Sequence, residues 1–257
     1  MTGLFRKITD RLLSYHRRLV HDPLLSVPEF AGRISRTEQI RYGSEARNCQ
    51  AVADMLLFGV EYVSGAAVEG DVVEFGCMTG RTATVLAAAM ASFRLDRKLH
   101  LFDSFEGLPD SNSETDQRSL HVKHGVWAPG TCRGISPAAL RGKCTRYLAG
   151  DQVLIYEGWF RDSMPRIPTG TRFGLLHVDC DLYQSAIDAL DYVFQQRMVA
   201  EGAIILFDDW NCNRASNDFG ERKAWQEVTA KYRITFSDAG DYGWAGHKFI
   251  VHTWQSQ

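Results

Sequence analysis

Short apolar runs that end at glycines or acidic residues recur from residue 71 onward, with stretches of helical periodicity between them. Such alternation predicts a mostly parallel sheet with helices on both faces. The predicted strands are residues 71–75, 99–103, 153–156, 173–178 and 203–207, and the predicted helices are residues 82–93, 136–148, 184–198 and 220–231. Two further β-like runs, residues 233–236 and 248–252, flank a turn-rich segment at 238–243 and predict an antiparallel edge hairpin. The pattern predicts a seven-stranded, Rossmann-like α/β fold.

The first 66 residues predict a helical extension ahead of a single domain at 67–257. Residues 1–22 have apolar positions at helical spacing among several arginines, residues 22–30 hold two prolines and predict a linker, and residues 44–66 predict a second helix. A basic amphipathic helix is compatible with a membrane surface. Because its apolar side is modest, we favour an arm that packs on the body or on a second subunit, which predicts a homo-oligomer, a dimer or larger.

One connection is much longer than an ordinary crossover. About fifty residues separate the strand ending at Asp103 from the strand at 153. A lid-like insertion at about 107–135 is therefore predicted, and it contains His121, His124 and Trp127, which either contact a substrate or lie on a surface excursion without chemistry.

Composition narrows the class of protein. The chain has 257 residues, 45% of them hydrophobic, which is enough for a full core. A net charge of −2 gives no reason to expect nucleic acid as a partner, and no apolar run predicts a membrane span or a signal peptide. The six cysteines contain no C-x-x-C pair, which is typical of reduced thiols in a cytoplasmic protein.

Four carboxylates follow two of the predicted strands. Asp179 and Asp181 come after the run at 173–178, and Asp208 and Asp209 come after the run at 203–207. The carboxyl ends of parallel strands are where open α/β sheets bind ligands, and crowded carboxylates repel one another unless a cation or a proton offsets their charge. Mg²⁺ is the natural occupant. The alternative is that Asp181 and Asp209 only cap the following helices.

The segment 73–82 predicts a strand, a glycine turn and a helix start. Gly76 and Gly80 allow close approach of a ligand to the backbone, but their spacing is not the dinucleotide-binding G-x-G-x-x-G, which disfavours an NAD-dependent enzyme. Glu74 before the glycines repels pyrophosphate and tolerates a sulfonium, while Asp103 is placed to accept hydrogen bonds from ribose hydroxyls. S-adenosylmethionine fits these features.

Five motifs follow one another along the chain: Glu74-Phe75-Gly76, Asp103-Ser104-Phe105-Glu106-Gly107-Leu108-Pro109, Glu157-Gly158-Trp159-Phe160, Asp179-Cys180-Asp181-Leu182-Tyr183 and Phe207-Asp208-Asp209. In these motifs the chain resembles the macrocin O-methyltransferase (TylF/MycF) family of class I S-adenosylmethionine-dependent methyltransferases. The resemblance covers roughly residues 70 to 230.

The resemblance implies Mg²⁺-dependent methyl transfer to a hydroxyl, in known members on a sugar of a natural product. It implies metal ligands at Asp179, Asp208 and Asp209, and cofactor contacts at Glu74, Gly76, Asp103 and Ser104, with Gly158 and Trp159 near the adenine. The chain departs from the family pattern at Cys77–Gly80 and at Trp210–Arg214, which affects the expected acceptor more than the cofactor.

The expected reaction needs a base that takes the proton of the acceptor hydroxyl. We assign this role to Asp181, beside Asp179 of the metal site, with His177, His121 and His124 as alternatives. The sequence leaves two other functions open: a metal-dependent hydrolase or hydroxylase, and a non-catalytic nucleoside-binding module. The first has no need of Glu74 and Asp103, and the second has no need of a lid.

Overall fold

The computed structural model describes residues 36–255, with side chains from residue 45 onward. The predicted arm at 1–22 and linker at 22–30 lie outside the described residues, so the homo-oligomer that rests on the arm stays a prediction. Within residues 36–255, no helix has the length and apolar character needed to cross a membrane.

Seven strands form one sheet in the order β3-β2-β1-β4-β5-β7-β6. Strands β1 to β5 are parallel, and β7 lies antiparallel between β5 and β6, so the predicted edge hairpin is confirmed. The strands are β1 (Asp71–Phe75), β2 (Leu99–Asp103), β3 (Val153–Glu157), β4 (Phe173–Val178), β5 (Val199–Phe207), β6 (Thr235–Tyr242) and β7 (Gly246–Thr253).

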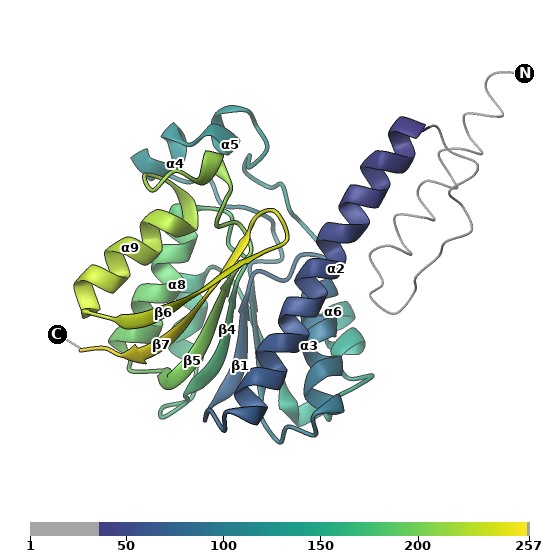
Figure 1. The fold of residues 1–257 in the computed structure, drawn as a ribbon, viewed down its shortest axis with the longest axis vertical. Helices are drawn as coiled ribbons and strands as arrows, with labels where there is room; N and C mark the ends of the chain where they lie inside the picture. Colours follow the sequence, from purple (N-terminus) through teal and green to yellow (C-terminus); the bar gives the residue numbers. More distant parts are fainter. Residues whose placement is uncertain (1–35, 256–257) are drawn as a thin grey trace, which may run out of the picture.

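Helices cover both faces of this sheet (Figure 1). On one face lie α2 (Arg36–Gly65), α3 (Arg81–Ser92) and α6 (Pro137–Cys144), and on the other lie α8 (Tyr183–Gln195) and α9 (Gly220–Tyr232). Three short helices, α4 (Glu114–Arg118), α5 (Leu120–Lys123) and α7 (Phe160–Ser163), belong to the connections, as do the 3₁₀ turns Gly150–Gln152, Met164–Arg166 and Asn213–Ala215.

The central strands are apolar on both sides because helices cover both faces. All six residues of β4 are buried, and Val72, Val73 and Phe75 of β1 are fully buried. Helix α8 instead buries a stripe at helical spacing, formed by Ala186, Ala189, Leu190, Val193 and Phe194. The continuous buried run of β4 and the helical stripe of α8 are the two patterns from which alternating strands and helices were predicted.

Among the helices and the parallel strands, three predicted boundaries were wrong by four residues or more. Helix α2 starts at Arg36 rather than 44, α6 ends at Cys144 rather than 148, and β5 starts at Val199 rather than 203. The turn predicted at 238–243 is also wrong, because β6 continues to Tyr242. A register shift between Asp238 and Asp241 leaves these polar residues on an exposed edge strand, where turn-type residues are tolerated.

The insertion at 107–135 carries α4 and α5, which lie over one end of the sheet (Figure 1). Its buried Asp116 accepts hydrogen bonds from the backbone N–H groups of Tyr183 (2.8 Å) and Gln184 (3.1 Å) and from the Ser111 hydroxyl (2.8 Å). The residue at the N-cap of α8, Leu182, has no capping side chain, so the insertion supplies the cap.

A second contact docks the insertion on the loop after β5. Asn213 Oδ1 accepts from the His121 backbone N–H at 3.0 Å, and the His121 ring stacks on Trp127 with centroids 4.4 Å apart. Trp127 packs with Leu182, Cys212 and Ala245 in a small apolar cluster. Thus His121 and Trp127 hold the insertion on the body.

Replacing Asp116 with asparagine is expected to loosen the insertion. The amide keeps one acceptor oxygen where the carboxylate uses both, so stability should fall by about 1–2 kcal/mol. Residues 110–113 line a pocket at this end of the sheet. In the methyl transfer expected from the motifs, the KM for the acceptor should therefore rise about tenfold while the affinity for S-adenosylhomocysteine stays the same. Thermal unfolding and steady-state kinetics measure the two effects. Glu114→Gln on the exposed side of the same helix is the control, and an equal loss of cofactor affinity in Asp116→Asn would contradict this role.

Candidate functional site

A pocket of about 730 Å³ lies at the carboxyl ends of the central parallel strands. It is lined by the glycine turn after β1, the end of β2, the first part of the insertion, the segment 158–162 and the loops after β4 and β5. One pocket therefore joins the features that the sequence predicted for a nucleoside and for a metal. Its lining includes Gly76, Asp103, Ser104, Gly158, Trp159, Asp179, Asp181, Asp208 and Asp209.

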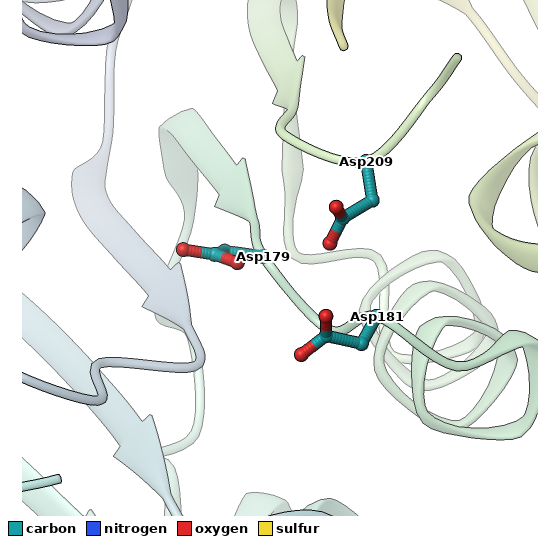
Figure 2. A group of neighbouring side chains, drawn as sticks. All are labelled: Asp179, Asp181 and Asp209. Atoms are coloured by element: carbon teal, nitrogen blue, oxygen red, sulfur yellow. The ribbon is translucent and has the colours of Figure 1, made fainter. Parts of the chain in front are cut away.

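Three aspartates meet in this pocket. Each of Asp179, Asp181 and Asp209 offers a carboxylate oxygen, and these oxygens lie within 4.8 Å of one another. Figure 2 shows the carboxylates of Asp181 and Asp209 facing each other, with Asp179 beside them. Asp181 has a left-handed backbone with φ of 58°, a conformation that Asp tolerates better than most residues.

Asp208 is not a member of this group of three, although it lines the same pocket. Its charge still acts on the group, because it adds to the raised pKa of Asp179, Asp181 and Asp209. The buried Oδ1 of Asp208 has no hydrogen-bond partner within residues 36–255. Asp208 as a metal ligand therefore stays a prediction.

The crowding of carboxylates changes their acidity. Burial, followed by the charge of Asp208, raises the pKa of Asp181 to about 7. Burial also raises the pKa of Asp179 and of Asp209 well above the usual range, and the neighbouring carboxylates add to both shifts. Two thiols lie beside the group: Cys212 Sγ is 3.2 Å from Asp209 Oδ1, and burial raises the pKa of the Cys132 thiol to about 12. The group therefore favours either protons or a cation.

These pKa shifts predict how stability depends on pH without metal. Because the pKa of Asp181 rises from 3.8 to about 7, the folded protein binds more protons than the unfolded chain between these values. Stability should then fall as pH rises through this window, by about 2 kcal/mol, or about 4–8 °C in Tm. Thermal unfolding in EDTA at pH 5 and pH 7.5 measures this. Added Mg²⁺ should restore the loss at pH 7.5, and a Tm in EDTA that does not change with pH would contradict the crowding.

Glu221 was not predicted, and it bonds to the loops that carry the aspartates. Its carboxylate is 1% exposed and accepts from the backbone N–H groups of Asp209 (3.0 Å) and Cys180 (3.4 Å). It thus contacts both aspartate-bearing loops. Nothing in the sequence pointed to it, because a glutamate in the first turn of a helix is ordinary.

The glycine turn is built around Asp103. Its Oδ2 accepts from the backbone N–H groups of Cys77 (2.7 Å) and Met78 (3.0 Å), and its Oδ1 accepts from that of Phe105 (2.6 Å). Gly76 has φ of 91°, and a Cβ there would lie 1.9 Å from the Asp179 carbonyl oxygen, so only glycine fits. The glycine turn and Asp179 are therefore in direct contact.

A match to a family model shows to which family the fold and these motifs belong. Residues 51–234 match the model described as macrocin O-methyltransferase (TylF), which covers more than half of the chain. The chain belongs to the macrocin O-methyltransferase family. The resemblance inferred from the motifs is thereby confirmed, and so is the class I methyltransferase fold.

Two relatives with named activities provide a comparison in sequence. The chain is 33% identical over 178 residues (66% of its length) to 8-demethyl-8-(2,3-dimethoxy-alpha-L-rhamnosyl)-tetracenomycin-C 4'-O-methyltransferase of Streptomyces olivaceus. It is 31% identical over 157 residues (59% of its length) to demethyldecarbamoylnovobiocin O-methyltransferase of Streptomyces niveus. The matched regions span 65% and 56% of these relatives' own lengths, less than two thirds of each.

Solved structures share the fold. The O-methyltransferase NovP superposes with a TM-score of 0.66 at 23% identity, covering 84% of this chain and 89% of NovP. The calicheamicin methyltransferase CalS11 superposes with a TM-score of 0.60 at 20% identity, covering 93% of this chain and 91% of CalS11.

Not every residue predicted for the cofactor lines the pocket. Glu74 is fully buried, and its Oε1 lies 2.9 Å from Nδ1 of the equally buried His177, its partner across β1 and β4. Gly80 faces α6, since a Cβ there would lie 2.7 Å from the side chain of Leu140. Neither Glu74 nor Gly80 lines the pocket, so the contact of each residue with the cofactor stays a prediction. Ser104 lines the pocket and closes its own turn by donating to the Gly107 carbonyl at 2.8 Å.

Proposed function

We propose that this chain is an S-adenosylmethionine-dependent O-methyltransferase that requires Mg²⁺ and methylates a hydroxyl on a sugar of a natural product. The observation that carries the proposal is the single pocket that joins the Asp103 turn to the group of Asp179, Asp181 and Asp209. Membership of the macrocin O-methyltransferase family supports methyl transfer. The relative from Streptomyces olivaceus is named for methylation of a rhamnosyl group, which supports a sugar acceptor.

The residues present fit a magnesium ion. Mg²⁺ prefers oxygen ligands and binds through a few carboxylates while it keeps positions open. Asp179 and Asp209 would hold it from two neighbouring strand ends, with Asp208 as the third ligand through the oxygen that has no partner among the described residues. The ion would supply positive charge that lowers the pKa of the acceptor hydroxyl.

The chain's own residues account for the remaining steps. Asp103 would orient the ribose, and Trp159 would contact the adenine, so that the methyl group faces the aspartates. The acceptor oxygen forms a bond to the methyl carbon as the carbon–sulfur bond breaks, which leaves S-adenosylhomocysteine. Asp181, which lines the pocket, would take the hydroxyl proton. The docked insertion would exclude water from this reaction.

The charge of the pocket favours an acceptor without phosphate or carboxylate groups. Eight aspartates and two arginines line it, and both arginines already have partners. Arg161 lies 3.7 Å from the Asp188 carboxylate, and Arg81 donates to Cys49 Sγ at 2.7 Å. A cation and S-adenosylmethionine offset only part of the negative charge, so an anionic acceptor would be repelled. We therefore propose a neutral or cationic glycoside.

Calorimetric titration with S-adenosylhomocysteine, first with Mg²⁺ and then with EDTA, tests the class of enzyme. We expect micromolar binding, about −8 kcal/mol, in both buffers. Methyl transfer from labelled S-adenosylmethionine to a panel of neutral glycosides then tests the reaction, with nucleotide-activated sugars as the anionic comparison. Absence of binding in both buffers would refute the proposal, and turnover that survives EDTA would refute the requirement for metal.

A further inference from the structure

The last hydrogen bond between β4 and β5 comes just before the aspartates. The backbone N–H of Asp208 donates to the Val178 carbonyl at 3.0 Å. Beyond this bond the two strands continue as the loops that carry Asp179, Asp181 and Asp209. Loops that leave a sheet have no ladder to fix their spacing. A metal site needs its ligands held to a fraction of an ångström.

Glu221 occupies the position of the next rung of this ladder. One of its carboxylate oxygens, Oε2, accepts from the N–H of Asp209, and the other, Oε1, accepts from the N–H of Cys180, between Asp179 and Asp181. One side chain therefore connects both loops at the level of the aspartates. Within residues 36–255, neither of these two backbone N–H groups donates to another acceptor.

The carboxylate is held from a rigid element. Glu221 lies in the first turn of α9, which is anchored by buried Ala224, Trp225 and Val228. Gly220 precedes it with φ of 56°, a backbone conformation that favours glycine and sets the direction in which the helix begins. Although an acidic residue in this turn commonly caps its own helix, this one instead reaches two other loops.

We propose that Glu221 is a positioning residue that holds the two aspartate-bearing loops at the spacing a divalent cation requires. It does not line the pocket and acts through the backbone of Cys180 and Asp209. This inference rests on the proposed metal-dependent function, and it adds a residue that neither the family motifs nor the group of aspartates contains. Partners that orient metal ligands typically change metal affinity 10–100-fold when they are removed.

Binding of Mn²⁺ alone, measured by calorimetry and by the electron paramagnetic resonance of free Mn²⁺, tests the inference without turnover. Glu221→Gln keeps the shape but can accept only one of the two bonds, so its Kd for Mn²⁺ should rise about tenfold. Glu221→Asp keeps the charge but is one methylene too short to reach both loops, and it should weaken binding similarly. Glu227→Gln, on the same helix and exposed, is the control and should bind as the wild type does.

The variants separate positioning from charge and from folding. In all of them the affinity for S-adenosylhomocysteine in EDTA should be unchanged, and a residue with only a structural role would lower the Tm without changing the Kd for Mn²⁺ of the folded protein. Wild-type affinity in both Glu221 variants would overturn the inference, as would wild-type affinity in Glu221→Asp alone, because charge would then suffice. Failure of the wild type itself to bind Mn²⁺ would instead refute the metal in the proposed function.

Discussion

Replacement of Asp179 by asparagine is expected to lower turnover about 10³-fold or more while the protein becomes more stable in EDTA. Asp179 belongs both to the ligand set implied by the family motifs and to the group of carboxylates in the structure. A neutral amide weakens the hold on a divalent cation, whose electrostatic effect is worth several kcal/mol in such reactions.

The gain in stability has the same origin as the loss of activity. Burial and the charges of Asp208, Asp209, Asp181 and Glu74 raise the pKa of Asp179, so a charge at this position is unfavourable without metal. Removing it should raise the Tm in EDTA at pH 7.5, whereas the wild type gains only when Mg²⁺ is added. Differential scanning fluorimetry and a radiolabelled methyl-transfer assay measure both effects, with exposed Asp218→Asn as the control. An active variant would show that Asp179 holds no catalytic metal.

The parallel core could be predicted because burial on both faces leaves a simple signal. Strands such as β4 are short, continuous apolar runs that end at an acidic residue. The prediction failed where neighbours in space decide the structure. The first part of β5 contains exposed Glu201, and β6 is an edge strand with mostly exposed residues, so neither has a hydrophobic run to detect.

The candidate site, like the fold, could be predicted from the sequence only in part. That aspartates from two strand ends meet followed from the sequence, because parallel strands that lie side by side bring their ends together. Which three meet did not follow, since the predicted ligand set contains Asp208 where the structure groups Asp181 with Asp179 and Asp209. The contact between Glu74 and His177 could not be predicted, because it depends on the pairing of β1 with β4. Glu221 and Asp116 could not be predicted either, because each contacts backbone groups far away in the chain, and such contacts depend on how helices and loops dock.

Asp181 and Asp208 are expected to separate into two roles when each is replaced by asparagine. Asparagine tolerates the left-handed backbone of Asp181, so Asp181→Asn should fold, and it should keep its affinity for Mn²⁺ within about threefold. Loss of a general base should lower kcat about 10²–10⁴-fold and remove the rise of kcat/KM with pH that ionisation of this carboxyl produces.

Asp208→Asn should give the opposite pattern. Its unpartnered oxygen is proposed to bind metal, so its Kd for Mn²⁺ should rise about 10–100-fold, and high Mg²⁺ should restore part of the activity while the pH profile keeps its shape. Mn²⁺ binding and pH–rate profiles of the two variants, measured side by side, decide the matter. If Asp181→Asn loses the metal and Asp208→Asn keeps it, the three carboxylates that the structure brings together are the ligand set, and the base must be sought elsewhere in the pocket.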